Sequence, residues 1–349
     1  MRRTLAYFTG SFWFTFICLV LGGLLGWYVH RTVAGVLSTV LIVALLGVLE
    51  TSLSFDNAVV NATVMRDMAP IWRHRFLTWG MAIAVFGMRF LFPVVVVSVV
   101  AKIGPIETVR LAAFDPAEYA RLLASAHVAL GAFGGAFLGM VSLKYFFDTE
   151  KEVHWIRFVE RQLVRLGKFE AIELGLMMVI LYGFSRFLSP EESHEFLVAG
   201  IFGLITFIGV DAIGDLMKPE EGHAPDLHKA GMAGFLYLNV LDASFSFDGV
   251  IGAFALTNEL FIIALGLGVG AMFVRSLTIL LVDRGTLESY AYLEHGAFYA
   301  VGALAGFMFI GTLVEVPQAV TGLVGAGFIG LAFWWSVRDV RRGLAARAE

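Results

Sequence analysis

Glu50-Thr-Ser-Leu-Ser-Phe-Asp56-Asn57 is a short polar motif inside a long apolar stretch, and the chain repeats it as Asp242-Ala-Ser-Phe-Ser-Phe-Asp248-Gly249. Both copies follow the order acid, any residue, Ser, apolar residue, Ser, Phe, Asp, and they begin 192 residues apart. Carboxylates are costly in apolar surroundings, so an ionisable residue at the depth of a membrane indicates a functional site. Its duplication indicates that two halves of the chain build one site.

The residues around both motifs have the composition of a membrane protein. Of the 349 residues, 58% are hydrophobic and 15% are charged, with a mean hydropathy of +0.80. A soluble domain has about 25% charged residues. We therefore expect an all-α, polytopic transmembrane helical bundle, with 1–349 as one integral membrane domain. Apolar runs of about 20 residues can cross a bilayer as helices. The predicted spans are 8–29, 36–62, 76–100, 123–147, 169–188, 195–217, 232–256, 260–283, 292–312 and 318–336.

Loop charges predict how these spans are oriented. With a cytoplasmic N-terminus, the inside segments hold 17 Lys and Arg residues and the outside loops hold 4. The positive-inside rule then places both termini in the cytoplasm. The motifs lie on the second and seventh spans, which run in opposite directions because five crossings separate them.

An inverted three-helix repeat follows from these directions. Spans 36–147 form repeat one and spans 232–312 form repeat two, with connecting spans over 148–231 and a final span at 318–336. Inverted repeats place a substrate site near the middle of the membrane, where the repeats meet. We expect the two motifs to lie there.

Helical geometry predicts a break inside each motif. At about 100° per residue, Glu50 and Asp56 would lie on nearly opposite faces of a continuous helix. Ser, Asp and Asn side chains compete with helical hydrogen bonds, and Gly249 adds backbone freedom. Breaks would let both acids face a cavity, together with the hydroxyls of Ser52, Ser54, Ser244 and Ser246. These hard oxygen donors suit Mg²⁺, Mn²⁺ or Ca²⁺.

Two arginines fall near the middle of apolar spans. We expect Arg89 and Arg275 each to pair with a motif acid and to hold it when no ion is bound. The alternative is that each caps backbone carbonyls or extends toward a membrane surface.

The motifs resemble those of a known family, the TerC integral membrane proteins named for tellurium resistance. Residues 50–58 resemble its Glu-x-x-Leu-Ser-x-Asp-Asn-Ala signature, and residues 242–250 resemble its Asp-x-x-Phe-x-x-Asp-Ser core, with Gly249 in place of the Ser. The small-residue run 135–139 with Lys144, and Tyr292-Leu-Glu-His-Gly296, are also similar. The chain looks like a divergent, uncharacterised branch of this family, which is related to the LysE-type exporters.

The resemblance implies a bacterial inner-membrane protein connected with Mn²⁺ efflux and metal supply to secreted proteins. The implied ion ligands are Glu50, Asp56, Asn57, Asp242 and Asp248.

The leading hypothesis is thus a secondary transporter that exports a divalent cation, Mn²⁺ first among them, in exchange for protons. The cation is a substrate, and we expect no tightly bound cofactor. Membrane lipid is an expected partner, nucleic acid is not, and homo-oligomers or partners in the secretion machinery are open. One alternative is an intramembrane aspartyl-type enzyme, although Phe precedes both Asp56 and Asp248 where such enzymes carry Gly-x-Gly-Asp. The other is a non-transporting protein that delivers metal to secretion.

Overall fold

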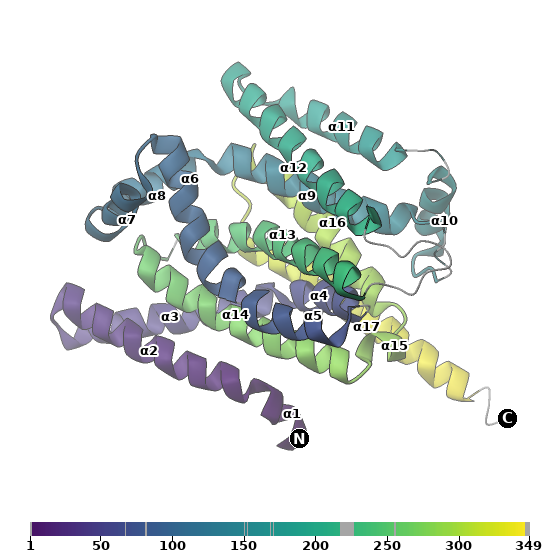
Figure 1. Cartoon of the computed structure of the whole chain (residues 1–349), viewed down its shortest axis with the longest axis horizontal. Coiled ribbons are helices and arrows are strands. Elements are labelled where there is room, and N and C mark those ends of the chain that lie inside the picture. Colours follow the sequence, from purple (N-terminus) through teal and green to yellow (C-terminus); the bar gives the residue numbers. More distant parts are fainter. Residues whose placement is uncertain are drawn as a thin grey trace. The chain divides into compact units, whose positions relative to one another are not determined.

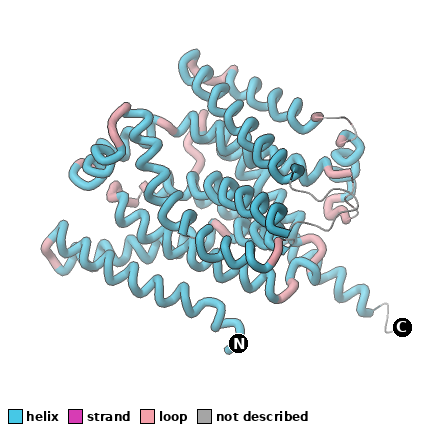
Figure 2. The backbone as a smooth tube through the Cα atoms, in the orientation of Figure 1, coloured by secondary structure: helices cyan, strands magenta, loops and turns pink. Residues whose placement is uncertain are grey.

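The computed structural model in Figure 1 describes residues 2–66, 68–80, 82–149, 151, 153–167, 169, 171–216, 227–254 and 256–345. Within these ranges the chain is helical, and no strand interrupts it (Figure 2). The predicted all-α polytopic bundle is confirmed.

Eight of the ten predicted spans are confirmed, within the described ranges, as helical segments long and apolar enough to cross a membrane. The two others are helical but differ from these. Span 169–188 is α11 (Ile172–Ser185), which has 14 residues, whereas a bilayer needs about 20. Span 232–256 is α13 (Leu227–Ala253), whose motif acids and Asn239 lower its hydropathy.

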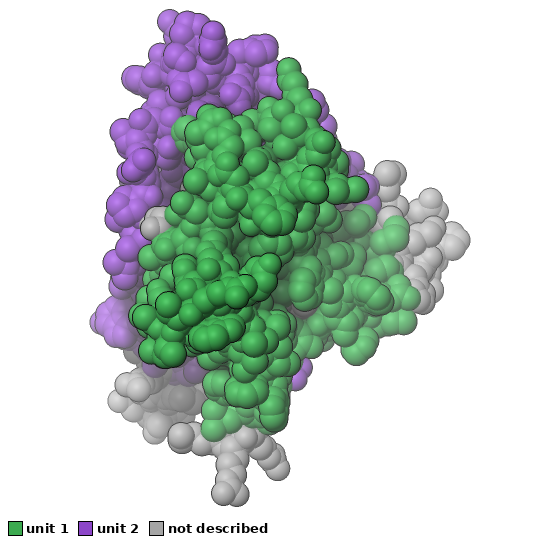
Figure 3. Space-filling model, turned by 90° about the vertical axis from the view of Figure 1, so that its left-hand side faces the viewer, with its two compact units in different colours: residues 1–58, 68–127, 225–280 green, residues 59–67, 128–224, 281–349 purple. Residues whose placement is uncertain are grey.

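The chain forms two compact units, coloured separately in Figure 3. Unit 1 contains residues 1–58, 68–127 and 225–280, and unit 2 contains residues 59–67, 128–224 and 281–349. Each unit therefore collects segments that are far apart in the sequence.

Unit 1 holds both copies of the motif. Its helices are α1 (Arg2–Leu5), η1 (Ala6–Phe8), α2 (Thr9–His30), α3 (Val33–Leu53), α5 (Pro70–Arg75), η2 (Phe76–Gly80), η3 (Ile83–Leu91), α6 (Phe92–Ala101), α7 (Pro105–Phe114), α8 (Pro116–Ser125), α13 and most of α14 (Leu260–Asp283). Pro70, Pro105 and Pro116 each begin a helix, where the missing N–H of proline is not needed. Tyr119 and Leu123 of α8 pack into a buried apolar cluster with residues of α3, α6, α13 and α14.

Unit 2 is built around helices from the second half of each predicted repeat. It contains most of α4 (Phe55–Arg66), then α9 (His127–Phe147), α10 (Arg157–Leu166), α11, α12 (Pro190–Leu216), α15 (Thr286–Ser289), α16 (Leu293–Gly311) and α17 (Gln318–Ala345). The hydroxyl of Ser142 on α9 donates to the carbonyl of Phe298 on α16 at 3.0 Å.

Contacts inside the units give the helix directions. α3 runs parallel to α14, because Leu46 lies against Gly266 and Glu50 against Gly270. α9 runs antiparallel to α16, since Gly131 lies against Thr312 whereas Ser142 lies against Gly302. In an inverted repeat the two third helices, α9 and α16, must run antiparallel. The first helix of repeat one, α3, must run parallel to the second helix of repeat two, α14. The repeat itself stays a prediction.

The predicted break is present in the first motif. α3 ends at Leu53, Ser54 forms a turn with φ −96° and ψ 23°, and α4 begins at Phe55. The hydroxyls of Thr51 and Ser52 donate to backbone carbonyls four residues earlier, at 2.6 and 2.7 Å. Bonds of this kind compete with the helical ladder and bend helices, so two in succession explain the break.

The predicted break in the second motif is wrong. Residues 242–249 lie inside the continuous helix α13. Ser244 makes one bond of the same kind, to the carbonyl of Val240 at 3.1 Å, but the hydroxyl of Ser246 accepts a bond from Arg89 instead. Gly249 lies within the helix, so the missing side chain leaves room for a neighbouring residue and does not serve an unusual backbone conformation.

Candidate functional site

The centre of the site is a buried ion pair in unit 1. Glu50 in the last turn of α3 and Arg89 in η3 are each 4% exposed, and Nη2 of Arg89 donates to Oε1 of Glu50. Nη1 of Arg89 donates to the carbonyl of Ala84 at 2.6 Å and to the hydroxyl of Ser246 at 3.2 Å. The arginine therefore connects the first motif to the second. It pairs with a motif acid, as predicted.

Arg89 owes its position to an irregular helix. Residues 83–91 of η3 and 76–80 of η2 form π-helical turns, before α6 begins with Pro93 in its first turn. π-Helical turns are rare and occur often at functional sites. Here the wider turn brings the guanidinium of Arg89 back to the carbonyl five residues before it.

Two glycines make room for Glu50. A Cβ atom on Gly249 of α13 would lie 2.8 Å from Oε2 of Glu50. A Cβ atom on Gly270 of α14 would overlap the Cβ and Cγ atoms of Glu50. The second copy of the motif thus has glycine at position 249 because the carboxylate of the first copy lies against it. A serine there would need the space that Glu50 occupies.

The other acid of the first motif begins a new helix. Asp56 is 6% exposed and lies in the first turn of α4, where the helix dipole stabilises a negative charge. Its Oδ1 accepts a bond from the backbone N–H of Asn57 at 3.0 Å. Ser54 and Asn57 are also buried, at 7% and 9% exposure. These three side chains are together at the break, as predicted.

Ser52 does not belong to this group. Its side chain is exposed, and its hydroxyl donates to the carbonyl of Val48. It was predicted to support the site, but it precedes the turn at Ser54 and so stays on the outer face of α3.

The second motif contributes Asp242, Ser244 and Ser246, which are 8%, 3% and 6% exposed. The side chain of Asp248 lies outside the described residues. The Nε of Arg275 donates to the carbonyl of Leu77 at 2.7 Å. This bond is of the kind expected for carbonyl capping, and the pairing of Arg275 with a motif acid stays a prediction.

The ligand chemistry of the buried residues is that of hard oxygen donors. Glu50, Asp56, Asn57 and Asp242 are brought into unit 1 as buried side chains. Among the described residues, no three His, Cys, Asp or Glu side chains are grouped closely enough to hold a metal ion. Arg89 occupies Oε1 of Glu50, so a metal cation would have to displace the guanidinium to bind at this oxygen.

A second buried polar cluster lies in unit 2 and was missed by sequence reasoning. Glu160 of α10 is fully buried, and its carboxylate lies 3.2 Å from Nζ of Lys151 and 3.5 Å from Nε2 of His295. It accepts bonds from the N–H of Ile156 at 3.1 Å and the hydroxyl of Tyr299 at 3.3 Å. The signal was present, since Glu160 stands on the same helical face as Leu163 and Val164.

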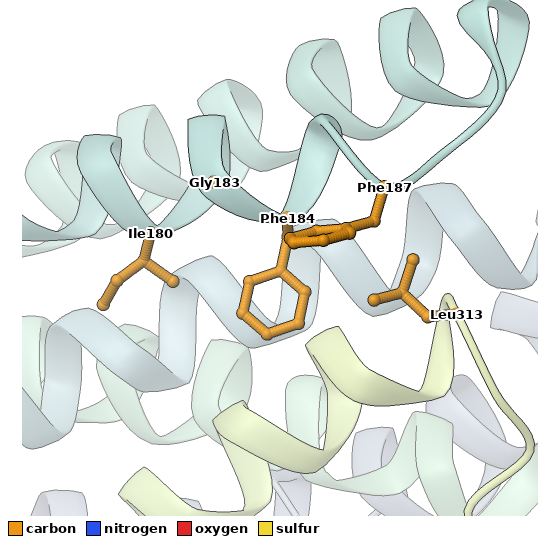
Figure 4. A pocket seen from close by; sticks show the side chains of 5 residues that line it. All are labelled: Ile180, Gly183, Phe184, Phe187 and Leu313. Carbon is orange, nitrogen blue, oxygen red and sulfur yellow. The ribbon is translucent and has the colours of Figure 1, made fainter.

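Unit 2 also has an apolar pocket of about 360 Å³ between α11 and the end of α16. Figure 4 shows its lining, which consists of Ile180, Gly183, Phe184, Phe187 and Leu313. The lining has no polar side chain, so the pocket is suited to hydrocarbon and not to a cation.

The fold and the buried ionic residues define a multi-pass helical membrane protein. The family model described as "Protein of unknown function (DUF475)" matches residues 55–343, and the chain belongs to this family. The match includes Asp56 and the whole second motif but begins after Glu50. No curated protein and no solved structure matches the chain.

Proposed function

We propose that this protein is a secondary transporter of the bacterial inner membrane that exports a divalent metal cation, with Mn²⁺ as the first candidate, in exchange for protons. The observation that carries the proposal is the Glu50 carboxylate, which is buried among apolar helices and neutralised by Arg89. An ionisable residue inside a membrane-spanning segment is a functional-site hypothesis by default. The resemblance of residues 50–58 and 242–250 to the TerC motifs supports the choice of a metal cation.

In this proposal, Arg89 neutralises Glu50 whenever no metal cation is bound. A charged carboxylate in a helix centre costs about 2.5–3.5 kcal/mol on insertion scales, and Arg89 offsets this cost for Glu50. An incoming divalent cation would replace the guanidinium at Glu50 and take further oxygens from Asp56, Asn57, Asp242 and Asp248. Its departure would return Glu50 to Arg89, so the acid is never left buried without a counter-charge.

The proposed site uses both motifs, as an inverted repeat predicts. The parallel packing of α3 with α14 and the antiparallel packing of α9 with α16 are consistent with such a repeat. The proposal includes cytoplasmic N- and C-termini, because the loops on that side would carry most of the Lys and Arg residues.

Ion flux in proteoliposomes tests the proposal. Vesicles would be loaded with Mn²⁺, Mg²⁺, Ca²⁺ or Zn²⁺, and metal efflux would be followed together with a pH-sensitive dye. We expect efflux of at least one divalent cation and its loss in Asp56→Asn and Asp248→Asn. Thr206→Ala is the matched control, because this hydroxyl on α12 donates to the carbonyl of Phe202 in its own helix and lies outside both motifs.

Either of two results would contradict the proposal. Full efflux by both aspartate variants would separate transport from the motifs. A complete lack of flux for every cation, from a folded protein, would favour the non-transporting role in metal delivery.

A further inference from the structure

The helix α10 presents two different rows of side chains on its outer face. Arg157, Arg161 and Arg165 are exposed and follow one another at intervals of four residues, so they form one row along the helix. Beside this row, Phe158 and Leu166 are 83% and 43% exposed. A helix with a basic row next to an apolar row is typical of segments that lie in the plane of a membrane surface.

The inner face of α10 is fixed by the buried cluster around Glu160. The Glu160 carboxylate is fully buried and bound by Lys151 and Tyr299. Lys151 in turn lies over the rings of Tyr145 and Phe146, at 4.0 and 4.7 Å from the ring centres. These contacts prevent α10 from rotating about its axis, so the arginine row and Phe158 must face outward.

The place of α10 in unit 2 is suited to contact with a membrane surface. The chain leaves the apolar helix α9 at Phe147 and enters the apolar helix α11 at Ile172, with α10 between them. Figure 1 shows α10 beside the ends of α9 and α11 rather than along their length. Because α9 is long and apolar enough to cross a membrane, a segment at its end would lie near the level of the lipid headgroups.

We propose that α10 is an interfacial helix that binds anionic phospholipid. Phe158 and Leu166 enter the boundary between headgroups and acyl chains, and Arg161 and Arg165 contact headgroup phosphates. Charge complementarity identifies the lipid, because the exposed face carries three arginines and no acidic residue. Arg157 stands at the edge of the row and also interacts with the hydroxyl of Tyr292. This proposal does not depend on the transported ion.

The test places an environment-sensitive fluorophore on α10 of the full-length protein. Gln162 is exposed and stands between Phe158 and Leu166 on the helix, so Gln162→Cys would be labelled in a Cys18→Ala background, which removes the only other cysteine. The protein would be placed in nanodiscs of phosphatidylcholine with increasing fractions of phosphatidylglycerol. We expect a blue shift of the emission as the anionic fraction rises, and its partial reversal by salt.

Two variants separate charge from other effects. Arg161→Gln with Arg165→Gln should require much more phosphatidylglycerol for the same shift. Each arginine near an anionic surface contributes roughly fivefold to partitioning, and both together about 25-fold. Arg161→Lys with Arg165→Lys should behave like the parent protein. A label at Ala117 of α8, an exposed residue, should not respond to the anionic lipid.

Three results would overturn the proposal. Equal emission in neutral and anionic nanodiscs would overturn the proposal, as would an unchanged response in the glutamine variant. A full blue shift in lipid-free detergent would point to burial against protein, and would also overturn it. Equal thermal unfolding midpoints for all variants would show that the exposed substitutions leave the fold intact.

Discussion

At the scale of the residue, the site depends on one carboxylate and the space around it. Glu50 is held by Arg89 on one side and has glycines at 249 and 270 on the others. The glycines let two helices approach the carboxylate closely, which keeps water from it and strengthens its attraction to Arg89. Removing one partner of a buried ion pair leaves the other charge uncompensated, at a cost of about 3–5 kcal/mol.

The glycine at 270 can be tested by a single methyl group. Gly270→Ala would place a Cβ atom into Glu50, and overpacking of this kind costs about 1–3 kcal/mol. We expect a lower thermal unfolding midpoint in detergent. Gly306→Ala on α16 is the control, since a Cβ atom there meets nothing within 4 Å. Equal midpoints for the two variants would contradict the described packing.

Arg89→Gln separates stability from ion binding. The variant should unfold at lower temperature, because Glu50 loses its counter-charge. If Arg89 competes with the cation, Mn²⁺ should raise the unfolding midpoint of the variant more than that of the parent protein. Mn²⁺ titrations of thermal unfolding measure both effects, and an equal Mn²⁺ response in the two proteins would argue against competition.

At the scale of the element, similar motifs gave one broken helix and one continuous helix. The sequence predicted both breaks from the same polar residues. Only the first copy has two adjacent hydroxyls, those of Thr51 and Ser52, bonded back to their own helix. In the second copy Ser246 is engaged by Arg89, which lies far away in the sequence. Local propensity could not predict that tertiary contact.

At the same scale, the buried Glu160 holds α10 against the rest of unit 2. Glu160→Gln should destabilise the protein by about 3 kcal/mol, because Lys151 would remain buried without its counter-charge. Adding Lys151→Met should recover a large part of this loss. Thermal unfolding and hydrogen exchange of 157–166 would measure it. A double variant no more stable than Glu160→Gln would contradict the pairing.

Burial lowers the pKa of Lys151 from its usual value of 10.5, although the nearby Glu160 opposes this change. Between the lowered pKa and 10.5 the unfolded chain binds more protons than the folded chain. The contribution of Lys151 to stability should therefore rise with pH in this window. Lys151→Met should flatten the rise in unfolding curves measured across it. The same slope in variant and parent would assign it to another group.

At the scale of the whole molecule, the sequence predicted the helical class and most spans, because long apolar runs have few alternatives in a membrane. It also predicted the burial of both motifs from the cost of their acids. It did not predict the role of Gly249 and left two possible partners for Arg275, since both depend on which helices meet. The buried Glu160 was missed because two of its partners, His295 and Tyr299, come from a helix far away in the sequence.

The predicted orientation can be tested in intact cells. In a Cys18→Ala background, a cysteine at Gln162 should react with a membrane-impermeant maleimide only after the cells are opened. A cysteine at Ala117 should react from outside, because the loop at 101–122 is predicted to be external. Labelling of both from the same side would require a different number of crossings between α8 and α10.

The π-helical turns of η2 and η3 have a further consequence for this molecule. Such a turn holds one more residue than an α-helical turn, and each residue of an α-helix corresponds to about 100° of rotation. A change of residues 83–91 to regular α-helical bonding would therefore swivel Arg89 by a large angle about the helix axis. The guanidinium would then leave Glu50. A small change in winding would thus be enough to exchange the partner of a buried charge.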